Sequence, residues 1–147
     1  MSGIGLPKKL CELIRRENPV RSNTVIILVT IDYSGYPRPC LLSPYQVVGG
    51  REPKEILVAV NSGSTTHSNL LERALCTLIF FTPPSAVYAK GEASKIREAA
   101  DGNTLFRVTL IEIKEDYSEV APIITQPLFD DSKVKPRYIQ TYLELSG

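Results

Sequence analysis

The chain has 147 residues, of which 43% are hydrophobic and 22% charged, and its formal net charge is +1. This length and composition are typical of one globular domain and argue against disorder over most of the chain. A dedicated duplex-DNA binder carries a basic surplus that neutralises phosphates, and this sequence shows none. We therefore expect no nucleic-acid partner.

The cysteines and the apolar runs indicate a compartment. Cys11, Cys40 and Cys76 are odd in number and form no C-x-x-C pair, which argues against a disulfide framework or a zinc site and favours a reducing environment. The N-terminal stretch becomes charged too early for a signal peptide, and the most apolar run, VIILVTI, is too short to span a bilayer. The sequence predicts a cytoplasmic protein with no membrane partner and no metal.

The first half of the chain changes its hydrophobic period after a short helix. The pattern over 7–17 predicts an amphipathic helix with a proline in its first turn. NTVIILVTID (23–32) is apolar on both alternating faces, which predicts a strand buried on two sides, as in a barrel wall that also meets a partner. A turn over 32–37 leads into a second strand over 38–49, where Pro39 and Pro44 indicate an edge or a bulge.

The second half alternates strands with short helical stretches. Strands are expected over 55–60, 76–81, 86–94 (with Gly91 at a bulge) and 105–116, and short helices over 69–74 and 95–103. The tail, 117–147, is expected to end in a helix and to cover the barrel or a partner subunit. Short strands at hairpin spacing predict a mainly β protein, a small antiparallel barrel in one domain over 1–147.

The loop VNSGSTTHSNL (60–70) precedes the helix expected over 69–74. Its small polar residues are preferred helix caps, and Asn69 followed by Glu72 resembles a capping box. The same residues also suit an anion, because a helix N-terminus attracts phosphate and several hydroxyls exceed what one cap needs. His67, the single histidine, adds a ring N–H but is a weak metal-ligand candidate. The residues alone leave the cap and the anion site both open.

The order of these pieces resembles the FMN-binding split barrels, the family of pyridoxamine 5′-phosphate oxidase and its relatives. The resemblance covers about 20–115. It rests on the strand VIILVTID running into an S-G-x-P turn, on RPCLL as an Arg-x-x-Leu-Leu segment, and on AVNSGSTT as a strand end and phosphate loop. NLLERALCTLIFF is similar to the helix and strand that follow, and VYAKGEAS to the strand that ends in Gly-x-Ala.

The resemblance implies a six-stranded antiparallel FMN-binding split barrel with the cofactor between the two subunits of a homodimer. FMN is the implied cofactor, ahead of FAD, a deazaflavin or haem. The implied roles are a phosphate or ribityl contact for Arg38, ring contacts for the strand ends, and phosphate contacts for the loop. The implied cofactor-binding residues are Arg38, Leu41, Leu42, Ser43, Val60, Asn61, Ser62, Ser64, Thr65, Thr66, His67 and Asn69.

The implied function is that of a flavin-dependent oxidoreductase acting on an unknown small molecule, with no catalytic side chain assigned. The alternative is a non-catalytic module, such as an FMN carrier, a haem or deazaflavin binder or a redox sensor, and a scaffold without cofactor is a third reading. Many relatives carry Arg-Lys where this chain has Thr65-Thr66. Arg38, His67, Lys90 or a residue of a second subunit would then have to supply the positive charge.

Overall fold

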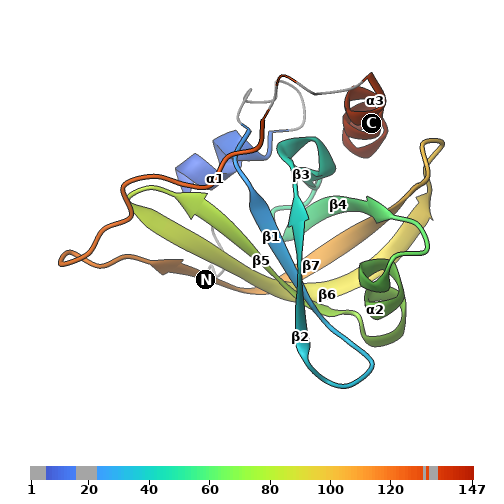
Figure 1. The fold of residues 1–147 in the computed structure, drawn as a ribbon, viewed down its shortest axis with the longest axis horizontal. Helices are drawn as coiled ribbons and strands as arrows, with labels where there is room; N and C mark the ends of the chain where they lie inside the picture. Colours follow the sequence, from blue (N-terminus) through green and yellow to red (C-terminus); the bar gives the residue numbers. More distant parts are fainter. Residues whose placement is uncertain (1–5, 16–22, 131, 133–135) are drawn as a thin grey trace.

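The structure is a computed structural model that describes residues 6–15, 23–130, 132 and 136–147. The described part is mainly β, with short helices at both ends of the chain and another, α2 (Thr65–Arg73), between two strands of the sheet (Figure 1). In chain order the elements are α1 (Lys8–Leu13), β1 (Ile26–Ile31), β2 (Pro37–Leu42), the 3₁₀ helix η1 (Pro44–Gln46), β3 (Val47–Gly49), β4 (Glu55–Asn61), α2 (Thr65–Arg73), β5 (Leu75–Thr82), β6 (Ser85–Glu98), β7 (Asn103–Asp116) and α3 (Pro136–Ser146).

The strands form one curled antiparallel sheet in the order β2-β1-β5-β6-β7-β4-β3. β2 and β3 stand at opposite ends of this order, yet they are consecutive in the chain and only η1 separates them. β2 pairs with β1, and β3 pairs with β4. A single stretch of chain therefore joins the two ends of the sheet, and the sheet curls into a barrel (Figure 1).

The core fills the inside of this barrel. Along β1 the inward side chains of Ile26, Leu28 and Thr30 are buried, and the alternate residues are only partly covered. Phe80 and Phe106 are fully buried and belong to the same apolar cluster. A second cluster forms where α3 packs against η1, β3 and β4, so the C-terminal helix covers part of the barrel, as expected.

The predicted fold class is confirmed, with seven strands in the described residues in place of six. The strand expected over 38–49 is divided because Ser43 caps η1 and Pro44 opens it. The capping box is complete, since the backbone N–H of Ser43 donates to Oε1 of Gln46 over 3.0 Å. The prolines predicted an edge or a bulge in this stretch. β2 is indeed an end strand of the sheet, and the interruption at Pro44 is a helical turn.

The helix predicted over 95–103 is wrong. β6 continues to Glu98 and pairs with β7 through this stretch, up to the pair of Glu98 with Thr104. The Asp-Gly signal marks the hairpin turn, where Gly102 has a φ of +86°. The helix expected over 7–17 is observed as α1, and 16–22 lie outside the described residues. No helix in the described ranges is long and apolar enough to cross a membrane, and the cytoplasmic location stays a prediction.

Gly91 sits at a bulge, as predicted, because the β6–β7 register shifts between Lys90 and Gly91. A Cβ at Gly91 would meet the carbonyl oxygen of Thr109 inside van der Waals distance and Cγ1 of Val108 at 2.9 Å. The close approach of the two strands at this point therefore requires a residue without a side chain.

We predict that Gly91→Ala lowers the free energy of unfolding by about 1–3 kcal/mol, because a well-packed strand pair must move apart. Urea denaturation measures this change. Gly49→Ala is the matched control, since a Cβ there meets Ile14 Cδ1 at an ordinary 3.6 Å. Equal destabilisation by the two substitutions would contradict the packing argument.

Candidate functional site

α2 begins at the loop that the sequence singled out. Ser64 is the N-cap: its Oγ accepts from the backbone N–H of His67 over 3.1 Å and donates to the carbonyl of Asn61 over 2.7 Å. The helix thus begins at Thr65, four residues earlier than predicted, and the expected capping box at Asn69 and Glu72 is wrong. One hydroxyl of the loop is committed to the cap.

The β1–β2 turn forms the opposite wall of the site. Oδ1 of Asp32 accepts from the backbone N–H groups of Ser34 and Tyr36, each over 2.9 Å, which fixes the turn. Arg38 is paired directly with Thr30, and directly paired residues share one face of a sheet. Nδ2 of the buried Asn69 donates to Oγ1 of Thr30 over 3.0 Å, so α2 is anchored to the face that carries Arg38.

A pocket of about 320 Å³ lies between α2 and this hairpin. We call it the α2–hairpin pocket. Its walls combine the first turn of α2, the exposed side of the same helix and the start of β2. It is lined by Asp32, Tyr33, Ser34, Arg38, Gly63, Ser64, Thr65, Ser68, Asn69, Glu72 and Arg73.

The pocket brings together Arg38, Ser64, Thr65 and Asn69, four of the residues predicted to bind the cofactor. The other predicted residues do not line it. Leu42 and Val60 are buried in the core, and Ser43 caps η1. Leu41 and Asn61 are exposed to solvent, and Thr66 is buried. Ser62 and His67 make local hydrogen bonds, which are described below. Their role as ligands stays a prediction.

His67 faces the barrel interior. Its Nδ1 accepts from the backbone N–H of Gly63 over 2.9 Å, so the proton of the neutral ring is on Nε2. Nε2 is buried and has no hydrogen-bond partner among the described residues. The ring meets Phe106 edge-on, with a centroid separation of 5.9 Å. The histidine therefore closes the loop around Gly63 and contributes no N–H to the pocket.

Ser62 belongs to a polar network at the end of the β6–β7 hairpin. Its hydroxyl lies 2.7 Å from that of Thr104 and donates to Oε1 of Glu98 over 3.3 Å. Thr104 donates to the same carboxylate oxygen over 2.7 Å, and Lys95 forms an ion pair with Glu98. The bond from Lys95, with those from Thr104 and Ser62, lowers the pKa of Glu98 to about 2. The network holds the strand end before the loop.

Sequence reasoning missed Arg73, the last residue of α2. It lines the pocket, and its Cζ lies 5.9 Å from the ring centroid of Tyr33. Nη1 lies 3.3 Å from Oε2 of Glu72, an ion pair without hydrogen-bond alignment, so this buried nitrogen makes no hydrogen bond in the described part of the chain. The signal was present, because Arg73 follows Thr65 by two helical turns on one face.

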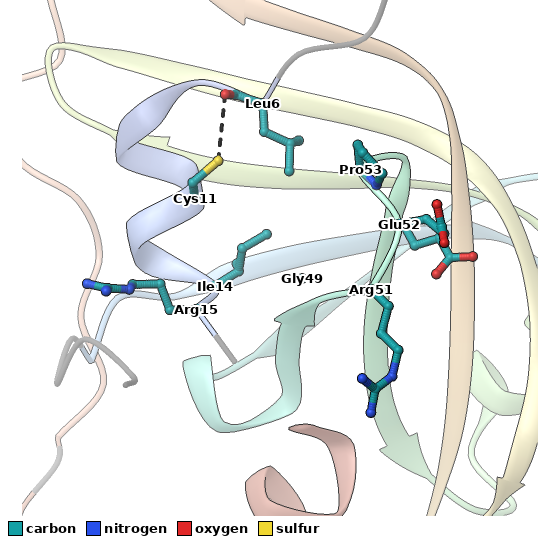
Figure 2. A pocket seen from close by; sticks show the side chains of 10 residues that line it. Leu6, Cys11, Ile14, Arg15, Gly49, Arg51, Glu52 and Pro53 are labelled. Atoms are coloured by element: carbon teal, nitrogen blue, oxygen red, sulfur yellow. Dashed lines mark hydrogen bonds between the residues drawn. The ribbon is translucent and has the colours of Figure 1, made fainter. Parts of the chain in front are cut away.

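A larger pocket, of about 380 Å³, lies between α1 and the β3–β4 turn (Figure 2). None of the predicted cofactor-binding residues lines it. Arg15 and Arg51 extend in different directions in Figure 2, and Nη2 of Arg51 donates to the carbonyl of Gly147 over 3.0 Å. One of the two arginines of this larger pocket is therefore already engaged by a backbone carbonyl.

No family model matches the sequence. No curated protein matches it either. Solved structures do match. A HupZ protein of Group A Streptococcus superposes with a TM-score of 0.58 at 12% identity, over 75% of this chain and 94% of that one. A Lactobacillus delbrueckii protein named after pyridoxamine 5′-phosphate oxidase superposes with a TM-score of 0.53 at 13% identity, over 63% of this chain and 84% of that one. An F420 reductase superposes with a TM-score of 0.55 at 10% identity, over 74% of this chain and 98% of that one.

The strand order, the closure through η1 and these superpositions agree. The chain has the split-barrel fold of these proteins. At 10–13% identity the likeness shows the fold alone, so the ligand and the chemistry have to be argued from this chain's own residues.

We predict that the Ser62–Thr104–Glu98 network stabilises the protein in a pH-dependent way. Because folding lowers the pKa of Glu98 from 4.5 to about 2, its stabilisation is complete above the ordinary value and is lost as the pH falls through about 2. The difference in Tm between wild type and Glu98→Gln should therefore shrink over this range. Glu92→Gln, on the exposed side of β6, is the control, and a pH-independent difference for Glu98→Gln would refute the prediction.

Proposed function

We propose that this protein binds FMN in the α2–hairpin pocket and acts as a flavin-dependent oxidoreductase on a small molecule. The observation that supports the proposal most is that Arg38 and the first turn of α2 line one pocket. A helix N-terminus carries unpaired N–H groups and a partial positive charge, and it attracts phosphate.

The residues of the pocket fit the phosphate end of the cofactor. Arg38 can donate two parallel hydrogen bonds to an oxyanion. The hydroxyl of the exposed Thr65 and the backbone N–H groups of the first turn of α2 add neutral donors. The Ser64 hydroxyl, being the cap, is not among them. The phosphate would thus rest on one arginine and on helix-terminal donors.

β2 offers the contacts that the ring of a flavin needs. Among the described strands it pairs with β1 alone, so no described strand covers its other edge, where backbone carbonyl groups can accept and Pro37 and Pro39 have no N–H to donate. Leu41 exposes 59% of its surface beside this edge and gives an apolar contact. FMN supplies hydride or electron transfer when bound, and the residues of this chain bind and orient it.

The alternative is a binding module that holds the cofactor without turnover. Bleaching of bound flavin by NADH or NADPH separates the two, since a carrier does not accept the hydride at a useful rate. A haem reading that relies on His67 has little support, because Nδ1 is hydrogen-bonded and Nε2 is buried. FAD or a deazaflavin would share the phosphate contacts, and mass analysis of the released cofactor distinguishes them from FMN.

We further propose a homodimer that meets through the outer face of β1, β2 and β5. Val29 and its neighbours on alternate positions of β1 point out of the barrel and are only partly covered. Their direct cross-strand partners on β2 include Leu41 and Pro39, both exposed, and β5 adds Leu75, which is 52% exposed. A contiguous apolar sheet face of this kind suits a second copy of the chain.

We predict that the purified protein shows a flavin absorbance spectrum or acquires one with added FMN. Arg38→Gln should weaken FMN binding by about 10- to 100-fold, because a charged hydrogen-bond donor to the phosphate is lost. Fluorescence quenching of FMN on titration with protein measures the Kd.

Arg51→Gln is the matched control for that substitution, since it removes the same charge from the larger pocket. It should leave the Kd for FMN unchanged. A Kd that responds to Arg51 and not to Arg38 would place the ligand in the other pocket and contradict the assignment.

We predict that Val29→Lys converts the dimer to a monomer in size-exclusion chromatography with light scattering, because a charge would be buried in the centre of the apolar face. Thr109→Lys, on an exposed position of β7, introduces the same charge away from that face and should leave the dimer intact. A wild-type chain that runs as a monomer at high concentration would end the homodimer proposal.

A further inference from the structure

The loop before α2 brings no cation to the α2–hairpin pocket, as its sequence indicates. The first turn of α2 carries Thr65 and Thr66, and neither is a cation. His67 is committed to Gly63, and Lys90 pairs with Glu112 over 3.0 Å. Of the side chains considered at the sequence level, Arg38 alone brings positive charge into this pocket.

Arg73 is the other cation that lines the pocket. Long side chains on a helix point back toward its N-terminus, so a guanidinium at the end of α2 extends toward the end that carries Thr65. The Arg73 side chain is 26% exposed, and its Cζ lies 5.9 Å from the ring centroid of Tyr33, another residue of the pocket wall. The guanidinium is therefore mostly shielded from solvent at the pocket wall.

The hydrogen bonding of Arg73 is incomplete. Nη1 is shielded from solvent and has no hydrogen bond within the described residues, and its contact with Glu72 is an ion pair at 3.3 Å. A shielded guanidinium N–H without an acceptor is costly, and an oxyanion in the pocket would satisfy it. Glu72 exposes 62% of its side chain, so it can turn to solvent when an anion replaces it.

We propose that Arg73 is a phosphate-binding residue of the α2–hairpin pocket, where it acts with Arg38 and competes with its neighbour Glu72. This inference rests on the proposed function for the identity of the ligand, but its charge argument applies to any phosphate. Arg38 from β2 and Arg73 from the end of α2 hold the anion from two sides. The positive charge thus comes from the last turn of the helix and not from the first.

The proposal makes adjacent residues act in opposite directions. Arg73→Gln should weaken FMN binding about tenfold, and Arg73→Lys should weaken it less because the charge is kept. Glu72→Gln should tighten FMN binding about two- to fivefold, because the competing exposed carboxylate is removed. A purely structural role for the Arg73–Glu72 pair would make both substitutions harmful.

Riboflavin, which lacks the phosphate, is the second ligand in this experiment. The ratio of the Kd for riboflavin to the Kd for FMN should fall in Arg73→Gln and rise in Glu72→Gln. Arg51→Gln should leave the ratio unchanged. A ratio that Arg73→Gln does not alter, or a loss of affinity for both ligands in equal measure, would overturn the assignment of Arg73 to the phosphate.

Inorganic phosphate tests the inference without the cofactor. At matched ionic strength, phosphate in place of chloride should raise the Tm of wild type and of Arg51→Gln more than that of Arg38→Gln or Arg73→Gln. If FMN does not bind but this difference is found, the proposed function fails and the anion site stands. If wild type binds neither FMN nor phosphate, the inference about Arg73 fails as well.

Discussion

The closure of the sheet through the stretch from β2 to β3 is the constraint on which the rest of the structure depends. Because β2 pairs with β1 and β3 pairs with β4, one run of chain joins both ends of the strand order. The break at η1 lets the chain change partner, and the capping box of Ser43 and Gln46 satisfies the backbone there. The turn between β1 and β2 fixes the register of this hairpin, and that register places Arg38 on the face where Asn69 anchors α2. The candidate site lies where this hairpin of the closed barrel meets α2.

The polar loop before α2 serves mainly to build the structure. Ser64 is the helix cap, Ser62 joins the network of Thr104 and Glu98, and His67 accepts from the N–H of Gly63. The excess of hydroxyls over what a cap needs, which favoured an anion site in the sequence, is thus partly used by local hydrogen bonds. Thr65 remains as a hydroxyl on the pocket wall. Helix capping and anion binding both rely on hydrogen bonds at a helix N-terminus. In this loop Ser64 makes the cap and its neighbour Thr65 faces the pocket.

The strands and their class could be predicted from the sequence because β-branched runs separated by turn residues are local signals. The sequence-based predictions were wrong or incomplete where the structure depends on residues that are distant in the sequence. Residues 95–98 carry mixed charges suited to an exposed helix, yet their partners on β7 continue the ladder and make them strand. Arg73 escaped notice because its relation to Arg38 exists only after the β1–β2 hairpin and α2 have packed together. The helical spacing of Arg73 from Thr65 could not be used as a signal, because the sequence predicted a helix only over 69–74 and so left Thr65 outside it.

The wall of the α2–hairpin pocket carries two carboxylates, Asp32 and Glu72, as well as the two arginines on β2 and α2. In formal charge the carboxylates balance the guanidinium groups. Asp32 accepts from the N–H groups of Ser34 and Tyr36, whereas the one ion pair of Glu72 within the described residues is that with Arg73, and its side chain is 62% exposed. The balance can therefore shift most readily through Glu72. A phosphate that displaces this carboxylate meets a net positive wall, and one that does not meets a neutral wall. Affinity for the anion is thus set by the competition at Arg73, at the opposite end of α2 from the loop that first suggested a phosphate site.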